Sequence, residues 1–306
     1  MNVGIIGLGV MGTAVAGHLL EAGHTVRGFD IDLDRIDALA YAGGVPEPSA
    51  SVVAEHSEVV LLWLPSVPAL EETTADLVQG AHDGLVVIEM GTLPLAAKAA
   101  ARDRLAGVGV DLLDAPVSGT GYQATDATLV IFASGSAAGF ETARPIFDVI
   151  GKSSYHFPEF GHGSVMKYIA NLLVTVHNLA AAEAHVLGIA AGLDPALVQQ
   201  VMSDGVGASR MFDIRGPMMV AGRYEPPAGR LDIILKDAGI IKDYAESRGV
   251  PTPLLDAALP VYGEASRQGL GGLDAAAVCR YLEEVGHIIR RPPAAYLRST
   301  FFGYIA

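Results

Sequence analysis

The chain has 306 residues, of which 51% are hydrophobic and 18% charged, which is typical of an ordered globular protein long enough for two domains. A formal net charge of −14 argues against a nucleic-acid partner, because such proteins need clustered Lys and Arg side chains to neutralise phosphates. The single cysteine, Cys279, cannot form an internal disulfide, and the opening residues do not resemble a signal peptide. We therefore expect a soluble, cytoplasmic protein without a membrane or nucleic-acid partner.

The first 160 residues alternate short apolar segments, rich in β-branched side chains, with helical segments. Such segments are typical of buried parallel strands, and their alternation with helices predicts right-handed βαβ units. The fold class that follows is α/β, with a Rossmann-type doubly wound parallel sheet. The predicted strands are residues 3–7, 25–30, 58–65, 84–90 and 108–114.

The strand signal ends at residue 157, and the rest of the chain favours helices. Residues 164–192 predict one long helix rich in Ala and Leu. Asp194 and Pro195 then provide an N-cap and a first-turn proline for the next helix. Further helices are expected at about 209–221, 231–248, 252–269 and 274–290.

These elements divide the chain into three predicted parts. They are a Rossmann domain at 1–162, an interdomain helix at 163–192 and an all-helical substrate and oligomerisation domain at 193–306. The tail cannot continue a helix through Pro292 and Pro293. Its aromatic segment, 296–306, is a candidate subunit-interface arm.

A glycine pattern lies at the first strand-to-helix junction. Gly7, Gly9 and Gly12 have the G-x-G-x-x-G spacing, which allows a tight turn, a close approach of a pyrophosphate and close packing of helix on strand. The helix N-terminus would supply N–H groups and a partial positive charge to the phosphates. A glycine-rich structural turn is the alternative. We assign the three glycines, with Leu8 and Met11 between them, to a dinucleotide cofactor.

The second strand ends in an acid that bears on the choice of cofactor. Asp30 lies 18 residues after Gly12, where a carboxylate can accept hydrogen bonds from a ribose diol and would repel a 2′-phosphate. Asp30 as a helix N-cap is the alternative, but Asp32 can serve that purpose as well. The sequence therefore predicts NAD, with NADP as the less favoured cofactor.

The long helix carries a polar stripe on an otherwise apolar surface. Lys167, Asn171, Asn178 and His185 fall within about 40° of arc. Buried polar groups are costly unless paired, so such a stripe usually faces a cavity, a ligand or another polar element. The alternative is a snorkelling lysine followed by amides that pack between helices, with Asn178 and His185 as satisfied interior groups.

The upstream dinucleotide motif favours a catalytic interpretation of Lys167. A lysine partly removed from water near another cation, here Lys236, has a lowered pKa and can exchange protons near neutral pH. Lys167 would accept the proton of an alcohol while hydride leaves, and Asn171, one turn later, would orient the substrate or the lysine.

A third candidate site follows the strand at 108–114. Ser118, Gly119 and Thr120 lie just past its carboxyl end, where ligands bind in open α/β sheets. Successive backbone N–H groups and a hydroxyl there could cradle a carboxylate. An ordinary Pro/Gly turn is the alternative.

Four motifs, at 7–24, 114–119, 161–173 and 235–245, together resemble the β-hydroxyacid dehydrogenase family, which includes 3-hydroxyisobutyrate dehydrogenase and tartronate semialdehyde reductase. The resemblance implies a Rossmann domain, a long interdomain helix and a helical domain that builds homodimers or homotetramers. It also implies roles for individual residues and assigns none to a metal. Lys167 would be the acid/base and Asn171 a substrate-orienting residue. Ser118 and Gly119 would hold the substrate carboxylate, and Lys236 would contribute to the closed active site. The nicotinamide side would be lined by Leu64, Pro65 and Thr92.

Three positions depart from the family pattern. Thr120 stands where a second glycine is common, Ala127 where another glycine is common, and Gly91 where serine is usual. The branched side chain of Thr120 is expected to reshape the anion pocket or make it smaller.

The sequence thus predicts an oxidoreductase that transfers hydride between NAD(H) and a small 3-hydroxy acid or the corresponding semialdehyde, with lysine as general acid/base. One alternative is a reductase of C=N bonds like the imine reductases, which generally lack lysine at the position of Lys167. The other is a non-catalytic dinucleotide-binding scaffold. Neither the substrate nor the direction of the reaction follows from the sequence.

Overall fold

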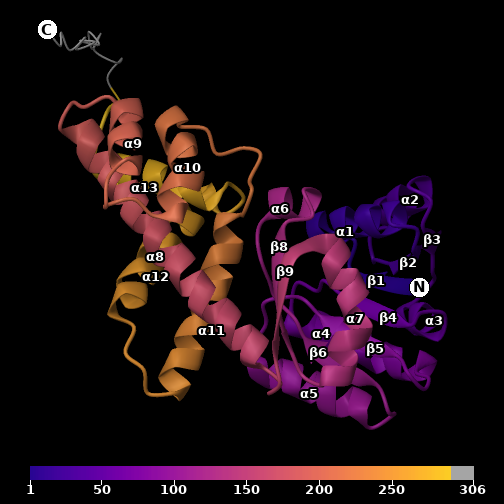
Figure 1. The fold of residues 1–306 in the computed structure, drawn as a ribbon. Coiled ribbons are helices and arrows are strands. Elements are labelled where there is room, and N and C mark those ends of the chain that lie inside the picture. The colour runs from indigo at the N-terminus through magenta and orange to yellow at the C-terminus, as the bar shows by residue number, and fades with distance from the viewer. Residues whose placement is uncertain (291–306) are drawn as a thin grey trace, which may run out of the picture. The chain divides into compact units, whose positions relative to one another are not determined.

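The computed structural model describes residues 1–290 and consists of two compact units (Figure 1). The first unit comprises Met1–Leu173 and Lys236–Thr252, and the second comprises Val174–Leu235 and the chain from Pro253. The candidate interface arm at 296–306 lies outside the described residues.

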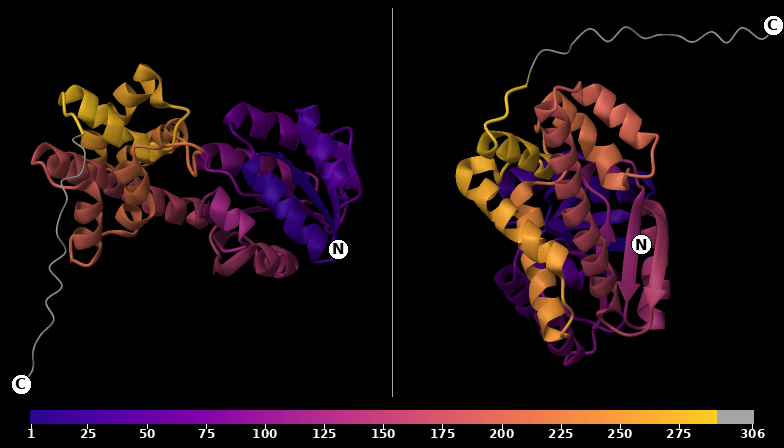
Figure 2. Two further views of the ribbon diagram at one scale, coloured as in Figure 1. Left: turned by 90° about the horizontal axis from the view of Figure 1, so that it is seen from above. Right: turned by 90° about the vertical axis from the view of Figure 1, so that its left-hand side faces the viewer.

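The first unit is built on a nine-stranded sheet. Its strand order is β3-β2-β1-β4-β5-β6-β8-β7, and β9 pairs with β8. The pairs are parallel except β6 with β8 and β7 with β8, which are antiparallel. The parallel β8 and β9 form the long ribbon pair in the right-hand view of Figure 2. The strands are β1 (Asn2–Ile6), β2 (Thr25–Phe29), β3 (Val45–Pro46), β4 (Val59–Leu62), β5 (Val86–Glu89), β6 (Asp111–Asp114), β7 (Val117–Ser118), β8 (Leu129–Ser134) and β9 (Gly151–Phe157).

Helices cover both faces of this sheet because successive strand side chains point to opposite sides. Along β4, Leu61 belongs to one buried cluster, with side chains of α1 and α7. Its neighbours Val60 and Leu62 belong to the other, with side chains of α3, α4 and α5. The helices lying wholly in this unit are α1 (Val10–Glu21), α2 (Leu33–Tyr41), α3 (Ala50–Glu55), α4 (Val67–Leu77) with a 3-10 turn at Val78–Gly80, α5 (Leu95–Ala106), α6 (Gly121–Thr125) and α7 (Ala137–Ile150).

Two longer helices pass from one unit to the other: α8 (His162–Ala190) and α11 (Leu231–Ser247). By length and composition α8 could cross a membrane, and half of its most apolar 18-residue stretch is buried inside the protein. The core helix of a globular protein satisfies the same test, so this property is weak evidence for a membrane span.

The second unit is helical throughout its described residues and has its own core, to which Phe212, Tyr262 and Val278 belong. Asp194 accepts a hydrogen bond from the Ala196 N–H (3.0 Å) and caps the helix that Pro195 begins, as predicted. Its remaining helices are α9 (Pro195–Ser203), α10 (Arg210–Ala221), α12 (Pro253–Ala265) with a π-helical turn at Ser266–Leu270, and α13 (Val278–Val285), which a 3-10 turn at Ala275–Ala277 precedes.

The predicted fold class is confirmed: a sheet dominated by parallel strands, a long helix and a helical C-terminal region. The five predicted strands correspond to β1, β2, β4, β5 and β6. The last predicted helix ends at Val285 rather than at residue 290.

Candidate active site

The glycine loop has the geometry of a phosphate cradle. At Gly7 the backbone has φ of +92°, and an added Cβ would lie 2.3 Å from the Trp63 carbonyl oxygen. A Cβ at Gly12 would lie 2.0 Å from the Gly7 carbonyl oxygen, so α1 packs directly on the turn. At Gly9 the nearest atom would be Nη1 of Arg35, 3.7 Å away, which leaves this side open to a ligand. Gly9 caps α1 without a side-chain hydrogen bond, and the N–H groups that begin the helix suit a pyrophosphate.

Asp30 is held beside this loop. Its Oδ2 accepts a hydrogen bond from the Leu8 N–H (2.6 Å), and its Oδ1 accepts one from the Asp32 N–H (2.9 Å). Asp32, rather than Asp30, caps α2 through the Asp34 N–H. The Arg35 guanidinium lies 3.4 Å from Asp30. The acid therefore lies where the ribose of a dinucleotide bound at the glycine loop would be recognised.

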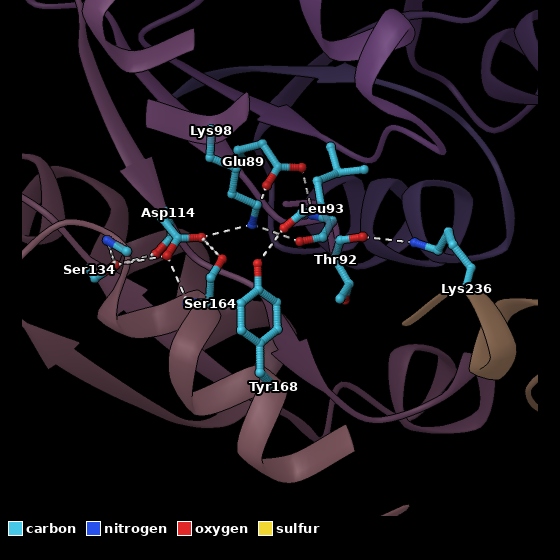
Figure 3. A network of polar contacts seen from close by, with 11 residues as sticks. Glu89, Thr92, Leu93, Lys98, Asp114, Ser134, Ser164, Tyr168 and Lys236 are labelled. Atoms are coloured by element: carbon cyan, nitrogen blue, oxygen red, sulfur yellow. Dashed lines mark hydrogen bonds and ion pairs between the residues drawn. The ribbon is translucent and has the colours of Figure 1, made fainter. Parts of the chain in front are cut away.

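The loop after β5, Gly91–Leu93, presents three successive carbonyl oxygens to three different helices (Figure 3). Lys98 of α5 donates to Gly91 (2.8 Å), Lys236 of α11 donates to Thr92 (2.7 Å), and Tyr168 of α8 donates to Leu93 (2.6 Å). Burial raises the pKa of Tyr168 to about 12, so its hydroxyl remains a donor. The backbone of the predicted nicotinamide-side loop is thus fixed residue by residue.

The departure at Gly91 has a structural reason. A Cβ there would lie 2.7 Å from Oε1 of Glu89 and 3.1 Å from the Leu64 carbonyl oxygen. Serine would collide with the Glu89 carboxylate, which accepts a hydrogen bond from the Gly91 N–H (2.8 Å). The same distances show that Leu64, after β4, lies next to the Gly91–Leu93 loop. Glycine at 91 is therefore the residue that the buried Glu89 requires.

A buried charged network lies under this loop. The Lys98 Nζ is 2.5 Å from Oε2 of Glu89 and 2.8 Å from Oδ1 of Asp114, and all three side chains are fully buried. Burial alone would lower the pKa of Lys98, but the two carboxylates outweigh it and hold that pKa well above its usual value. The two carboxyl groups thus favour the charged form of Lys98, while burial raises the pKa of Glu89 despite its contact with Lys98.

Asp114 connects this network to the first turn of α8. It accepts hydrogen bonds from the Ser164 N–H and hydroxyl, both at 2.7 Å, and from the Ser134 hydroxyl at 3.0 Å (Figure 3). A carboxylate is favoured near a helix N-terminus, where N–H groups lack partners within the helix. The end of β6 thus anchors the turn that precedes Lys167.

Lys167 lies one turn after Ser164 and is half-buried. Burial lowers the pKa of its ammonium group, the nearby Asp237 opposes this, and Lys236 and Lys98 lower it further. Asn171 donates to Oδ2 of Asp237 (2.7 Å), and the Lys236 ammonium lies 3.0 Å from Oδ1 of the same carboxylate. The structure therefore brings Lys167, Asn171 and Lys236 together around Asp237.

The second half of the polar stripe on α8 is structural. In the second unit, Asn178 donates to the Tyr262 hydroxyl (2.7 Å) and to the Ala275 carbonyl oxygen (2.9 Å). The His185 ring pairs with Oε1 of Gln199 (3.0 Å). Asn178 and His185 are the hydrogen-bonded interior groups that the alternative interpretation describes.

The candidate carboxylate loop begins where β7 ends. Gly119 has φ of +147°, and a Cβ there would lie 2.7 Å from Cδ2 of Leu129. Thr120 uses both its N–H (2.7 Å) and its hydroxyl (2.6 Å) to bind Oε1 of Gln123, so it caps the short helix α6. Within residues 1–290 no hydrogen bond joins Ser118, Gly119 or Thr120 to Lys167. Ala127, the other departure, has φ of +51°, a conformation that glycine adopts more readily.

Sequence reasoning did not assign five residues that shape this region. They are Asp237 and the network residues Glu89, Lys98, Asp114 and Ser164. A pocket of about 490 Å³ also lies nearby, but none of the predicted site residues lines it. Its walls are Pro94, Leu95, Ala96, Ala99, Tyr168, Ile240, Asp243, Tyr244, Ser247 and Arg248.

Comparison with known proteins agrees with this geometry. A family model for the NAD binding domain of 6-phosphogluconate dehydrogenase matches residues 2–161. A second model, for the NAD-binding region of NADP-dependent 3-hydroxyisobutyrate dehydrogenase, matches residues 161–282.

Similar proteins cover nearly the whole chain. L-threonate dehydrogenase of Cupriavidus necator is 36% identical over 91% of this chain and 95% of its own. NAD-dependent L-serine dehydrogenase of Pseudomonas aeruginosa is 32% identical over 89% and 95%, respectively. The crystal structure of 3-hydroxyisobutyrate dehydrogenase from Salmonella typhimurium has a TM-score of 0.84 at 31% identity, covering 92% of this chain and 99% of that one. The chain belongs to the β-hydroxyacid dehydrogenase family and is an NAD(P)-dependent dehydrogenase of CH–OH groups, with NAD as its cofactor.

Proposed function

We propose that this protein oxidises a small 3-hydroxy acid, or reduces the corresponding semialdehyde, with Lys167 as the general acid/base. The observation that carries the proposal is the environment of Lys167, where burial and two further lysines lower the pKa of an amine that lies near Asn171 and Asp237. A lowered pKa increases the fraction of neutral amine near neutral pH, and the neutral amine is the form that accepts a proton.

NAD, when bound, supplies the hydride acceptor. The glycine loop and the start of α1 would hold its pyrophosphate, Asp30 its ribose diol, and the loops after β4 and β5 its nicotinamide side. The open side of Gly9 and the uncapped N-terminus of α1 fit that assignment. The residues concerned are Gly7, Leu8, Gly9, Met11, Gly12, Asp30, Leu64, Pro65, Thr92 and Lys236.

Lys167 accepts or donates the proton of the substrate hydroxyl, depending on the direction of the reaction. In oxidation its neutral amine accepts that proton as the carbonyl forms, and in reduction its ammonium returns a proton to the carbonyl oxygen. Asn171, held by Asp237, orients the reacting oxygen. Lys236 is tied to both Asp237 and the Thr92 carbonyl oxygen, and it contributes a positive charge beside the substrate.

Ser118 and Gly119 are the proposed anchors of the substrate carboxylate. The N–H and the hydroxyl of Thr120 both donate hydrogen bonds to Gln123. Thr120 therefore adds a bulky side chain, rather than a hydrogen-bond donor, to this part of the pocket. The expected substrates are therefore short acids, in which few atoms separate the carboxylate from the hydroxyl.

The test is NADH formation by the purified protein with a panel of hydroxy acids. L-threonate, L-serine and 3-hydroxyisobutyrate, which the names of the similar proteins suggest, come first, followed by glycerate and 3-hydroxypropionate. We expect turnover of at least one of them with NAD and weaker turnover with NADP. Turnover of a cyclic imine, with none of any hydroxy acid, would contradict the proposal.

We also propose that the protein is a cytoplasmic homodimer or homotetramer. Large apolar side chains of the second unit support this, because Leu187, Leu197 and Val201 are exposed in the single chain. Light scattering on the purified protein tests the assembly, and a monomer at micromolar concentration would contradict it.

A further inference from the structure

Lys98 occupies a position where the pattern of α5 calls for an apolar side chain. Ala101 and Leu105, three and seven residues later, are both buried in the cluster on one face of the sheet. Lys98 shares this buried face but carries a charge, and it is fully buried. A leucine or methionine would satisfy the helix pattern without removing an ammonium group from water.

Stability alone does not explain a lysine at this position. Replacing a buried ion pair by well-packed apolar side chains is often neutral or stabilising, because two desolvated charges seldom recover their full hydration energy from each other. What an apolar residue would not provide is directed hydrogen bonding. The Lys98 ammonium donates hydrogen bonds to Oδ1 of Asp114 and to the Gly91 carbonyl oxygen, and it forms an ion pair with Glu89.

The three partners of Lys98 lie in parts of the first unit that belong to the proposed active site. Glu89 ends β5, Gly91 begins the loop assigned to the nicotinamide side, and Asp114 ends β6 (Figure 3). Asp114 in turn binds both the N–H and the hydroxyl of Ser164. The chain of contacts from Lys98 to the first turn of α8 is therefore continuous.

We propose that Lys98 is a positioning residue: it fixes the Gly91–Leu93 loop and, through Asp114 and Ser164, the first turn of α8, which precedes Lys167. This inference rests on the proposed role of Lys167. Lys98 itself is buried and touches neither substrate nor cofactor, so it acts through the backbone that it holds and through its own charge.

The electrostatics agree with this geometry. The charge of Lys98 is one of the influences that lower the pKa of Lys167. Asp114 and Glu89 raise the pKa of Lys98 and so favour its charged form. Lys98 therefore provides a positive potential close to the amine that exchanges the proton.

The test uses a variant that removes one charge of each sign from the network and leaves Asp114 with its hydrogen bonds from Ser134 and Ser164. Lys98→Met alone leaves Glu89 and Asp114 without their cation and is expected to unfold easily. The double variant Lys98→Met/Glu89→Gln removes one positive and one negative charge together. The matched control is Arg215→Met, which breaks the buried Arg215–Asp274 pair (3.1 Å) of the second unit and contacts neither the loop nor the first turn of α8.

Three quantities are measured on wild type, double variant and control at a temperature where all are folded. They are kcat and the KM for NAD, the titration midpoint of Lys167 by NMR of ¹³Cε-labelled lysine, and the amide exchange rate of Ser164. The labelled spectrum is simple because the chain has five lysines, Lys98, Lys152, Lys167, Lys236 and Lys242.

In the double variant we expect kcat to fall about 10- to 100-fold with little change in the KM for NAD, because the glycine loop is untouched. The Lys167 midpoint should rise, and the Ser164 amide should exchange faster. Wild-type values of all three quantities in the double variant, or the same changes in Arg215→Met, would overturn the proposal. If the wild-type protein turns over no hydroxy acid, the proposed function is wrong. The NMR and exchange measurements still test whether Lys98 affects the Lys167 midpoint and the Ser164 amide.

Discussion

Two lysines of the first unit, Lys98 and Lys167, have opposite surroundings. Lys98 is fully buried between two carboxylates, which hold its pKa above the usual value. Lys167 is half-buried, and within residues 1–290 its ammonium has no carboxylate at ion-pair distance; burial lowers its pKa. Neighbouring charges, rather than burial alone, decide which lysine is a fixed cation and which can exchange a proton.

Because of this difference, we expect Lys98 and Lys167 to have different functions in the site. Lys98 contacts the Gly91 carbonyl oxygen and two carboxylates, each at the end of a strand. The loss of Lys98 should therefore affect the structure first. Among the described residues, 1–290, the Lys167 ammonium has no such partner, so the loss of Lys167 should affect chemistry first. The four predictions below test this difference, beginning with the largest effect.

The largest effect is expected for Lys167→Ala. Losing the proton acceptor should reduce kcat about 1000-fold, since general acid–base catalysis typically contributes 10²- to 10⁴-fold. NADH binding, measured by fluorescence, and the melting temperature should change little. Lys152→Ala, at an exposed lysine of β9, is the matched control and should keep full activity. Near-normal turnover by Lys167→Ala would show that Lys167 is not the general acid/base.

The second effect is one of stability. Lys98→Met should lower the free energy of unfolding by about 3–5 kcal/mol, because it leaves two buried carboxylates without a counter-charge. Urea denaturation measures this change. Adding Glu89→Gln should recover part of the loss, whereas a single variant as stable as wild type would show that the network contributes no structural constraint.

The third prediction concerns pH. Oxidation requires neutral Lys167, so kcat for the hydroxy acid should rise with pH and level off above the pKa of Lys167. Because burial lowers that pKa, the rise should occur at lower pH than a lysine with the usual pKa of 10.5 would give. Reduction of the semialdehyde requires the ammonium form and should fall over the same pH range. Stopped-flow or steady-state rates in both directions give the two profiles, and profiles that do not mirror each other would count against Lys167 as the shared acid and base.

The smallest effect is expected for Asp237→Asn. The Asp237 carboxylate raises the pKa of Lys167, so its removal should move the oxidation profile to lower pH. Asparagine still offers an oxygen to the Asn171 amide, which limits the loss of orientation. A profile shifted to higher pH would mean that the sign of this interaction is wrong.

Local patterns in the sequence predicted much of this structure. The strands β1, β2, β4, β5 and β6 and the glycine loop each depend on neighbouring residues, so their signals lie within short windows. The strand β8, which runs antiparallel to β6 and β7 and parallel to β9, also has an apolar sequence with β-branched residues and could have been predicted by the same rule. The two-residue strands β3 and β7 are too short to show a period.

The buried network could not be predicted in this way. Lys98 lies among alanines on a helix, and nothing in that segment indicates two carboxylates opposite it. Glu89, Asp114 and Ser164 come together only when β5, β6 and α8 pack, and Ser164 is 50 residues from Asp114 in the chain. Thr120 was expected to shape an anion pocket, but the capping contact with Gln123, visible only in the structure, shows where its hydroxyl is used.

The most direct test is the titration of Lys167 in the wild-type protein, followed through its ¹³Cε signal. We predict a Lys167 midpoint below the usual lysine value of 10.5 and equal to the apparent pKa of kcat for oxidation. A Lys167 midpoint at 10.5 would contradict the central claim that the fold prepares Lys167 for proton transfer.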